Sequence, residues 1–300
     1  MKKGKKALIL INAYLQSQPQ FSQAERMQAE LEMLGVQTDI KRNDGFYAVV
    51  SDNNIQTSLL QDYDFCVYFD KDKYVSEMLE KAGLKLFNRH EAIRVCDDKM
   101  QTYIALSGKN IPMPKTASGL LCYHADAKIK GETVDEVEKM FSYPVIVKEC
   151  FGSQGKGVYM AKNREELISL MEELKCRPHL FQETVQTSVG KDIRVIVVGG
   201  KVVASMLRQS NTDFRSNIEL GGEGSVYTIS TKIQTLCERI ANILSLDYCG
   251  IDVLFGEGNE PMICEVNSNA FFAGIERVTG VNVAKAYAEH IYKEVYGEDR

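Results

Sequence analysis

The stretch Cys249–Asn267, CGIDVLFGEGNEPMICEVN, constrains the fold more than any other. It predicts two short strands joined by a four-residue turn at 257–260. In the register set by that turn, Asp252 lies opposite Glu265, and Asn267 shares their face because side chains alternate along a strand. A slip of one residue would put the two carboxylates on opposite faces. The other face is predicted to be apolar and carries Ile251, Val253, Phe255, Met262, Cys264 and Val266.

Asp252, Glu265 and Asn267 would present two carboxylates and an amide oxygen from one rigid hairpin. Such hard oxygen ligands suit Mg²⁺, which completes its shell with water and substrate phosphates. For any one of these residues alone, a solvated strand face is the better interpretation. The three together, beside an unbroken apolar face, favour a metal site.

Composition sets limits on the class of protein. A chain of 300 residues is long for a single core, so we expect two or three subdomains. A net charge of −5 argues against nucleic acid as the main partner, although a local basic cleft is compatible with it. The eight cysteines include no C-x-x-C and the four histidines are scattered, which excludes the usual zinc spacings and a disulfide framework.

The first residues, MKKGKKALILINAYL, superficially resemble a signal peptide. The apolar run is short, Asn12 interrupts it, and no small-residue cleavage site follows. We therefore predict a first β-strand over 7–11. No stretch approaches the length of a membrane span, so we expect a cytoplasmic protein without a membrane partner.

Residues 1–90 alternate between strand and helix patterns, which predicts a parallel α/β unit. Ser22 and Glu25 predict a capping box that opens a helix ending near Gly35. The unit lacks G-x-G-x-x-G after its first strand, so we interpret it as a platform that contributes substrate contacts. Beyond the first strand and helix, the pattern predicts strands over 36–41, 64–69 and 84–87 and a helix over 73–82.

Gly108, Pro112 and Pro114 end a predicted helix over 98–106 and mark a domain boundary. In a hairpin around Gly199-Gly200-Lys201, Asp192, Arg194 and Arg208 are predicted to share one face. The remaining predicted strands cover 143–150, 158–161, 180–185, 192–198 and 202–208, and the helices cover 133–140, 165–175, 231–244 and 283–296.

Gly152, Gly155 and Gly157 lie in a loop between two predicted strands. Glycines let the backbone approach a ligand closely, so that peptide N–H groups can cover phosphates. The loop is no Walker A motif, and its strand–loop–strand setting is similar to the phosphate cover of protein kinases. Glycine-rich loops are common without function, and Lys148 and Lys99 nearby would each alone be read as solvated lysines.

Arg194 and Arg208 would offer two forks suited to phosphate or carboxylate oxygens. The segment Phe214-Arg215-Ser216-Asn217, followed by Gly221-Gly222, adds another cation and an amide beside flexible backbone. Taken alone, each arginine is explained equally well as a solvent-exposed side chain on a strand face. Convergence of lysines, a glycine loop, arginines and a metal site in one cleft predicts transfer of a nucleotide's terminal phosphate.

The collinear order of these motifs resembles the ATP-grasp superfamily and, within it, the RimK-type glutamate ligases. The resemblance covers about residues 95–295. It implies α/β and α+β architecture: a small parallel pre-ATP-grasp domain (1–95), then a central (96–186) and a C-terminal (187–300) ATP-grasp subdomain. The motifs are Asp98-Lys99, PVIVK (144–148), GSQGKGV (152–158), QE-x-V (182–185), GKDIRVIVVGGKVVASMLR (190–208), FRSN…GG (214–222), GIDVL (250–254) and EVN (265–267).

The resemblance also implies ATP and Mg²⁺ as cofactors, with Mn²⁺ as an alternative metal, and assigns roles to residues. The implied metal ligands are Asp252, Glu265 and Asn267. The implied catalytic residues are Arg194, Arg208 and Asn217. The implied ATP contacts are Lys99, Lys148, Gly152, Ser153, Gln154, Gly155, Gly157, Gln182, Glu183, Val185 and Asp192.

The expected function is an ATP-dependent carboxylate–amine ligase that forms an amide through an acyl phosphate and releases ADP and phosphate. It would add glutamate or another amino acid to a small molecule, peptide or protein. The alternative is a non-catalytic ATP-binding module, and a homo-oligomer stays open. Many RimK-type members read small-Asn/Ser-Pro-Gly after EVN, whereas this chain reads Ser268–Phe272 (SNAFF) beside the expected substrate pocket, which leaves the acceptor open.

Overall fold

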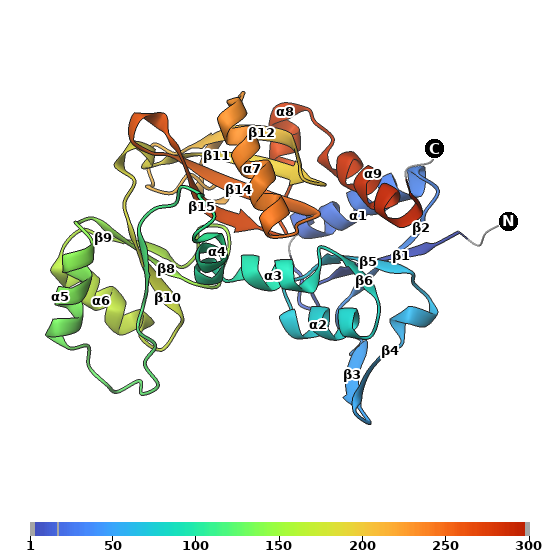
Figure 1. Ribbon diagram of the computed structural model, residues 1–300, viewed down its shortest axis with the longest axis horizontal. Helices are drawn as coiled ribbons and strands as arrows, with labels where there is room; N and C mark the ends of the chain where they lie inside the picture. Colours follow the sequence, from blue (N-terminus) through green and yellow to red (C-terminus); the bar gives the residue numbers. More distant parts are fainter. Residues whose placement is uncertain (1–3, 17, 298–300) are drawn as a thin grey trace.

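Three sheets and one separate hairpin organise the chain, which a computed structural model describes over residues 4–16 and 18–297. Figure 1 shows the N-terminal sheet at the right, the central sheet at the left and the C-terminal sheet at the top. Within the described ranges, no helix is long and apolar enough to span a bilayer.

The N-terminal unit is a parallel sheet in the order β2-β1-β5-β6, which confirms the predicted α/β alternation. β1 is the predicted first strand, and its apolar run is buried. The strands are β1 Lys6–Ile11, β2 Gln37–Arg42, β5 Phe65–Phe69 and β6 Lys85–Phe87, and the helices are α1 Gln18–Met33, α2 Lys73–Lys81 and α3 His90–Asp97.

Helix α1 begins at Gln18, so Ser22 lies inside it and the predicted capping box is wrong. The preceding turn is held by tertiary packing, because Phe21 contacts the hydrophobic core and the Arg42 guanidinium lies 4.6 Å from its ring. The predicted end is confirmed. Gly35 has φ +82°, the left-handed conformation that commonly terminates a helix.

Between the strands predicted over 36–41 and 64–69, where no strand was predicted, lies a hairpin with strands β3 Ala48–Ser51 and β4 Asn54–Thr57. Asp52 and Asn53 connect the strands with φ of 49° and 63°. Two adjacent left-handed residues are typical of a type I′ turn, which favours Asn and Asp. Figure 1 shows this hairpin projecting from the N-terminal unit.

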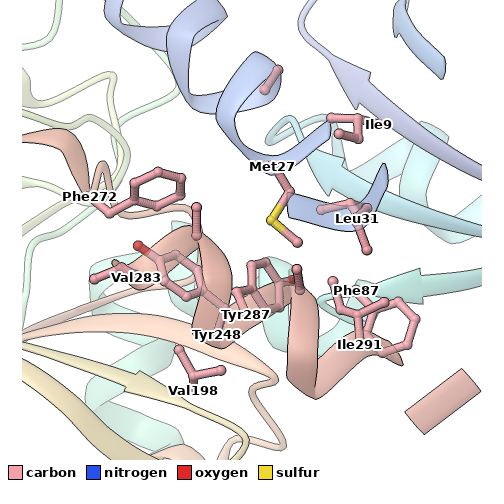
Figure 2. Close-up of a cluster of buried hydrophobic side chains, with 14 of the residues drawn as sticks. Ile9, Met27, Leu31, Phe87, Val198, Tyr248, Phe272, Val283, Tyr287 and Ile291 are labelled. Carbon is pink, nitrogen blue, oxygen red and sulfur yellow. The ribbon is translucent and has the colours of Figure 1, made fainter. Parts of the chain in front are cut away.

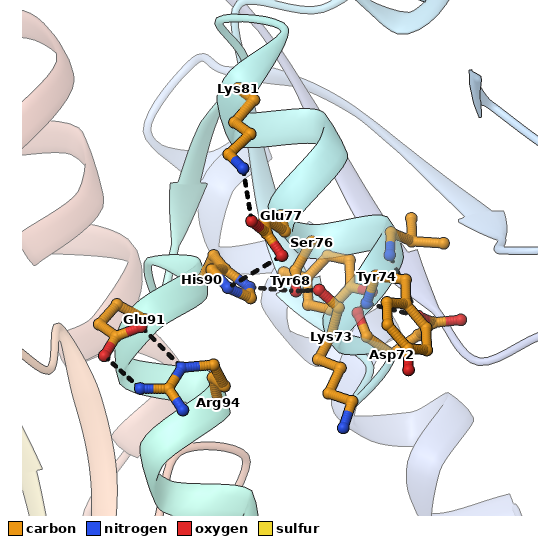
Figure 3. Close-up of polar contacts among 11 residues, drawn as sticks. Tyr68, Asp72, Lys73, Tyr74, Ser76, Glu77, Lys81, His90, Glu91 and Arg94 are labelled. Atoms are coloured by element: carbon orange, nitrogen blue, oxygen red, sulfur yellow. Dashed lines mark hydrogen bonds and ion pairs between the residues drawn. The ribbon is translucent and has the colours of Figure 1, made fainter. Parts of the chain in front are cut away.

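Figure 3 shows how polar contacts join α2 to α3. Asp72 caps α2 by accepting from the Tyr74 N–H at 2.9 Å. Ser76 Oγ lies 3.0 Å from His90 Nδ1, and Glu77 lies 3.8 Å from His90 Nε2. Ser76 is fully buried, so this Ser–His–Glu arrangement is a structural contact and offers no accessible nucleophile.

The central subdomain is an antiparallel sheet in the order β7-β10-β8-β9, with α5 and α6 beside it (Figure 1). Its hydrophobic core contains Val134, Val147, Leu167 and Phe181 and draws only on this part of the chain. The elements are β7 Thr116–Ser118, α5 Gly131–Met140, β8 Val145–Glu149, β9 Val158–Ala161, α6 Arg164–Leu174 and β10 His179–Glu183; α4 Lys99–Leu106 precedes them.

The C-terminal subdomain is an antiparallel sheet in the order β13-β12-β11-β14-β15. Asp192 pairs with Arg208 across the first hairpin and Arg194 pairs with Met206, which confirms the predicted shared face. Val198 pairs with Lys201, so the turn is one residue shorter than the predicted Gly199-Gly200-Lys201, and a bulge compensates for it. The strands are β11 Lys191–Val198, β12 Lys201–Gln209, β13 Glu223–Val226, β14 Tyr248–Phe255 and β15 Pro261–Asn267, and the helices are α7 Thr231–Ile243, α8 Ala273–Thr279 and α9 Val283–Tyr296.

The second hairpin confirms that Asp252 lies opposite Glu265 but corrects the rest of the predicted register. Phe255 pairs with Pro261, so the loop is one residue longer than expected, and a bulge compensates for it. Ile263 therefore joins the buried core. The predicted apolar face is wrong at two positions, Met262 and Cys264, and Cys264 lines a cleft instead.

The N-terminal unit and the C-terminal subdomain share one hydrophobic core, called the shared core below. Figure 2 shows Met27 and Leu31 of α1 meeting Tyr287 of α9 and Tyr248 of β14. The rings of Tyr248 and Tyr287 stack with centroids 4.9 Å apart. Phe272, expected beside the substrate pocket, is instead buried in this core at 1% exposure.

Asn88, at the end of β6, adds a polar connection between the same two units. Its amide donates to the carbonyl oxygens of Tyr248 and Ser268 at 2.7 and 2.8 Å. Its oxygen accepts from the N–H groups of Asp247 and Tyr248 at 2.7 and 3.0 Å. Because Asn88 is buried, these four bonds fix how β6 lies against β14 and the residues that follow β15.

Candidate active site

A cleft lies between the central sheet and the C-terminal sheet. The glycine loop, residues 152–157, lies along it. Most residues predicted for the site line this cleft: Lys99, Lys148, Ser153, Gly155, Gln182, Glu183, Val185, Asp192, Arg208, Asn217, Asp252 and Glu265. The structure therefore brings together motifs that are far apart in the sequence.

One wall of the cleft is a face of the central sheet. Ile146 pairs with Met160 and Lys148 pairs with Val158 across β8 and β9, and Gln182 pairs with Ile146 across β8 and β10. Residues paired in this way share a face, so apolar side chains surround a single cation. This wall suits a flat apolar group next to a negatively charged one.

Lys148 is buried at 6% exposure, with its Nζ 3.5 Å from Cys264 Sγ on β15. Burial alone would lower the pKa of Lys148, but Cys264, Tyr103 and Glu265 raise it, and the pKa lies above its usual value. Burial raises the pKa of the Cys264 thiol. Lys148 on the central sheet is therefore an ammonium that faces a neutral thiol on β15 of the C-terminal sheet.

The opposite wall carries alternating charges across three strands. Arg208 donates to both carboxyl oxygens of Asp192 at 2.7 and 2.5 Å and lies 2.9 Å from Asp252. Arg194 makes a bidentate contact with Asp252, including one bond of 2.8 Å. Burial alone would raise the pKa of Asp252, but Arg194 and Arg208 hold it below its usual value, so the carboxylate is ionised at neutral pH.

These contacts bear on the predicted arginine roles. The guanidinium groups of Arg194 and Arg208 were expected to face a substrate. In the structure they form ion pairs with the carboxylates of Asp192 and Asp252. Glu265 makes a longer ion pair than these aspartates do, because Lys99 Nζ lies 3.7 Å from its Oε1. Within the described ranges, no group of three or more His, Cys, Asp and Glu side chains is arranged to hold a metal ion.

Some predicted residues lie outside the immediate lining. Among the residues that the structure describes, five that were predicted for the site do not line the cleft: Gly152, Gln154, Gly157, Arg194 and Asn267. The three loop residues have positive φ, which shapes the backbone between residues that do line the cleft. Arg194 contacts the lining through Asp252, and Asn267 lies two residues beyond Glu265 on the same strand.

Gln182 and Glu183 line the cleft with side chains that are already engaged. The Gln182 amide donates to Tyr103 Oη and Thr116 Oγ1, both at 2.8 Å, and Tyr103 donates to the Cys264 carbonyl at 2.6 Å. Glu183 Oε1 accepts from a backbone N–H at 2.7 Å. Tyr103 thus joins the central sheet to β15, a contact that the sequence analysis did not predict.

Several other lining residues were also missed. Lys156 could have been found, since it lies inside the predicted glycine loop, and Leu254 follows Asp252 on the same face of β14. Cys264 was hidden by the bulge in β15. The remaining missed residues are Ile146, Val158, Met160, Thr184, Ser188, Val189 and Lys191. Phe214, Arg215 and Ser216 also line the cleft, and they belong to the segment that the sequence analysis singled out together with Asn217.

Two antiparallel sheets that enclose a cation-lined cleft beneath a glycine loop define a nucleotide-binding protein of the ATP-grasp class. The model of the RimK-like ATP-grasp domain matches residues 96–291, more than half of the chain. The chain belongs to the RimK-like ATP-grasp family.

Named relatives agree with this family. The chain is 38% identical over 228 residues to beta-citrylglutamate synthase B of Danio rerio, a match that covers 75% of this chain and 55% of that protein. It is 35% identical over 222 residues to a probable alpha-L-glutamate ligase of Maridesulfovibrio salexigens, covering 73% and 71%. The chain spans only about half the length of the first of these relatives.

A solved structure supports the fold independently. D-alanine–D-alanine ligase from Bacillus anthracis, complexed with ATP, matches with a TM-score of 0.73 at 16% identity and covers 97% of this chain and 100% of its own. At that identity the likeness concerns the fold alone. It confirms the predicted class, a parallel α/β unit ahead of two ATP-grasp subdomains.

Proposed function

We propose that this protein is an ATP-dependent carboxylate–amine ligase that forms an amide through an acyl phosphate and releases ADP and phosphate. The observation that carries the proposal is the pair of facing walls in one cleft. One holds apolar side chains around Lys148, and the other holds paired carboxylates and arginines. Positioning and neutralising charge is what phosphoryl transfer requires.

The cleft suggests how ATP would lie. Adenine would fit between Ile146 and Met160 on one wall and Leu254 on the other, beside the backbone of 183–185. Asp192 would lie near the ribose. The phosphates would extend toward Lys99 and Lys148 under the glycine loop, whose backbone N–H groups would cover them.

The residues present fit a divalent metal. Asp252 and Glu265 are ionisable carboxylates at paired positions, and Asn267 adds an amide oxygen next along β15. We propose that these three residues hold Mg²⁺, with Mn²⁺ as an alternative, since both take oxygen ligands. When bound, the metal would neutralise charge on the phosphates.

The chain's own groups would then orient the carboxylate substrate. Arg208 donates from Nε and Nη2 to Asp192, and Nη2 also contacts Asp252. Its Nη1 would then be available to donate to an acyl phosphate. Arg194 would keep Asp252 ionised and in place. Asn217 lines the cleft beside the glycine loop and would contact the acyl group.

The names of two relatives, a probable alpha-L-glutamate ligase and a beta-citrylglutamate synthase B, support a proposal for the substrate class. We propose glutamate or another amino acid as the amine, and a small molecule, peptide or protein as the carboxylate. We further propose the division into 1–95, 96–186 and 187–300, supported by the separate core of the central subdomain. A cytoplasmic location is proposed because all eight cysteines, each among the described residues, are free thiols.

The test is to identify products under turnover across an array of carboxylates and amines. ADP with phosphate, and a hydroxamate when hydroxylamine is the amine, is the expected result. AMP with pyrophosphate would contradict the acyl-phosphate mechanism. ADP without an amide or hydroxamate across the array would favour a plain ATPase or the alternative of a non-catalytic ATP-binding module.

A further inference from the structure

The glycine loop is docked on the segment 213–221 that follows β12. Arg215 forms the centre of this contact. Its Nη1 donates to the carbonyl oxygen of Gly155 at 2.8 Å and to that of Val158 at 3.4 Å. The tip of the loop and the start of β9, both from the central subdomain, are thereby connected to one side chain of the C-terminal subdomain.

Contacts with Asp213 hold the Arg215 side chain in the orientation that contacts the loop. Its Nε and Nη2 donate to the two carboxyl oxygens of Asp213 at 2.9 and 2.8 Å, and the Arg215 N–H donates to the same carboxylate at 2.8 Å. The Gly190 N–H donates to the Phe214 carbonyl at 2.8 Å, which connects the segment to the start of β11. The guanidinium therefore presents its third nitrogen to the loop at little further cost in side-chain entropy.

The fit between the loop and the segment depends on Gly155. Its φ is +73°, and a Cβ at this position would lie 2.8 Å from Asn217 Oδ1 and 2.8 Å from Leu220 Cδ1. A side chain would thus be strained and would separate the loop from the segment. Because Asn217 is expected beside the acyl group, the docked loop covers the place where the acyl phosphate would form.

We propose that Arg215 is a positioning residue that latches the glycine loop over the reacting centre and so excludes water from the acyl phosphate. This inference rests on the proposed ligase function. With the loop latched, the amine nitrogen forms the C–N bond, phosphate leaves with the C–O bond electrons, and the nitrogen loses a proton. With the loop open, water attacks the same carbon and gives the free carboxylic acid and phosphate, so ATP is consumed without an amide.

The experiment compares Arg215→Ala, Arg215→Lys and Gly155→Ala with the control Arg277→Ala, which removes an exposed arginine on α8. Hydrogen exchange of residues 151–158 is measured with a non-hydrolysable ATP analogue and Mg²⁺. In parallel, the ratio of ADP to amide is measured under turnover. Thermal melts and circular dichroism verify that each variant is folded.

Loss of the latch should lower the protection of the loop about 10-fold, the effect of one charged hydrogen bond. Arg215→Ala and Gly155→Ala should both raise the ratio of ADP to amide, Arg215→Lys should lie in between, and Arg277→Ala should match the wild type. Should Arg215→Ala fail to fold, Gly155→Ala and Arg215→Lys provide the same test.

Unchanged loop protection and an unchanged ratio in folded Arg215→Ala and Gly155→Ala would overturn the latch. A merely structural role of Arg215 predicts lower thermal stability with an unchanged ratio, and that result would overturn it too. Loss of loop protection in both variants, with no amide product even from the wild type, would support the latch and contradict the proposed ligase function instead.

Discussion

The N-terminal unit and the central subdomain contact the C-terminal subdomain in opposite ways. The first contact is apolar: β1, α1, β14 and α9 contribute to the shared core, where Tyr248 and Tyr287 have at most 1% exposure (Figure 2). The second surrounds a polar cleft, and the central subdomain keeps a core of its own. Between its sheet and β15, Tyr103 provides a short chain of hydrogen bonds.

This difference indicates which contact is able to open. Separating the shared core would expose a large apolar surface, at roughly 25 cal/mol for each Å². Separating the walls of the cleft breaks a few polar contacts that water can replace. We therefore expect the central subdomain to move as a unit around ATP, while the N-terminal unit and the C-terminal subdomain remain one body.

The largest effect is expected in the shared core. Phe272→Ala should lower the free energy of unfolding by about 4 kcal/mol, because it removes a fully buried ring. Hydrogen exchange should show reduced protection in both β1 and β14. The matched variant Leu167→Ala, in the central core, should destabilise β8 and β10 but spare β1. Reduced protection of β14 alone in Phe272→Ala would contradict a shared body.

The next effect concerns the cleft and should leave stability unchanged. Glu265→Gln should reduce turnover about 100-fold, equivalent to about 2.7 kcal/mol of transition-state stabilisation, because a proposed metal ligand loses its charge. Its thermal melting curve should match that of the wild type. A variant with wild-type turnover and Mg²⁺ dependence would count against Glu265 as a ligand.

A smaller effect is expected at the contact between the sheets. Tyr103→Phe removes the hydroxyl between Gln182 and the Cys264 carbonyl, and should cost about 1 kcal/mol. If that contact sets the width of the cleft, KM for ATP should rise about fivefold, which corresponds to the same energy, with kcat little changed. Lower stability with unchanged KM would show that Tyr103 serves packing alone.

The smallest effect is a pH dependence at the loop contact. The Arg215 guanidinium lowers the pKa of Asp213 below its usual value. The ion pair should therefore contribute fully above pH of about 4, where the free carboxyl titrates, and be lost as pH falls further. Protection of the glycine loop, corrected for the intrinsic exchange rate, should fall over that range in the wild type but not in Asp213→Asn. Equal pH dependence in the two proteins would exclude this ion pair as the cause.

Sequence reasoning succeeded where local patterns are strong. The pairing of Asp252 with Glu265 and the shared face of Asp192 and Arg208 were predicted from the alternation of side chains. Both observed turns differ by one residue from the expected length, and a bulge in each hairpin compensates. The parallel N-terminal sheet was predicted from the alternation of strand and helix patterns. The glycine loop was placed between two strands, as observed for β8 and β9.

Sequence reasoning failed where tertiary contacts determine the local structure. The bulge that turns Cys264 into the cleft has no signal in the strand pattern. The beginning of α1 at Gln18 depends on Phe21 packing against distant residues, and the aromatic Phe272 proved to be a core residue. The engagement of Gln182 by Tyr103 depends on how two sheets face each other, which no local pattern encodes.

The most direct test of the account is hydrogen exchange of the whole wild-type protein with and without a non-hydrolysable ATP analogue and Mg²⁺. We predict increased protection in the glycine loop and in the connections around 107–115 and 184–190, with no change in β1, α1, β14 or α9. Unchanged protection of the loop and connections, together with a change across the shared core, would contradict the proposal that the central subdomain closes on a single rigid body.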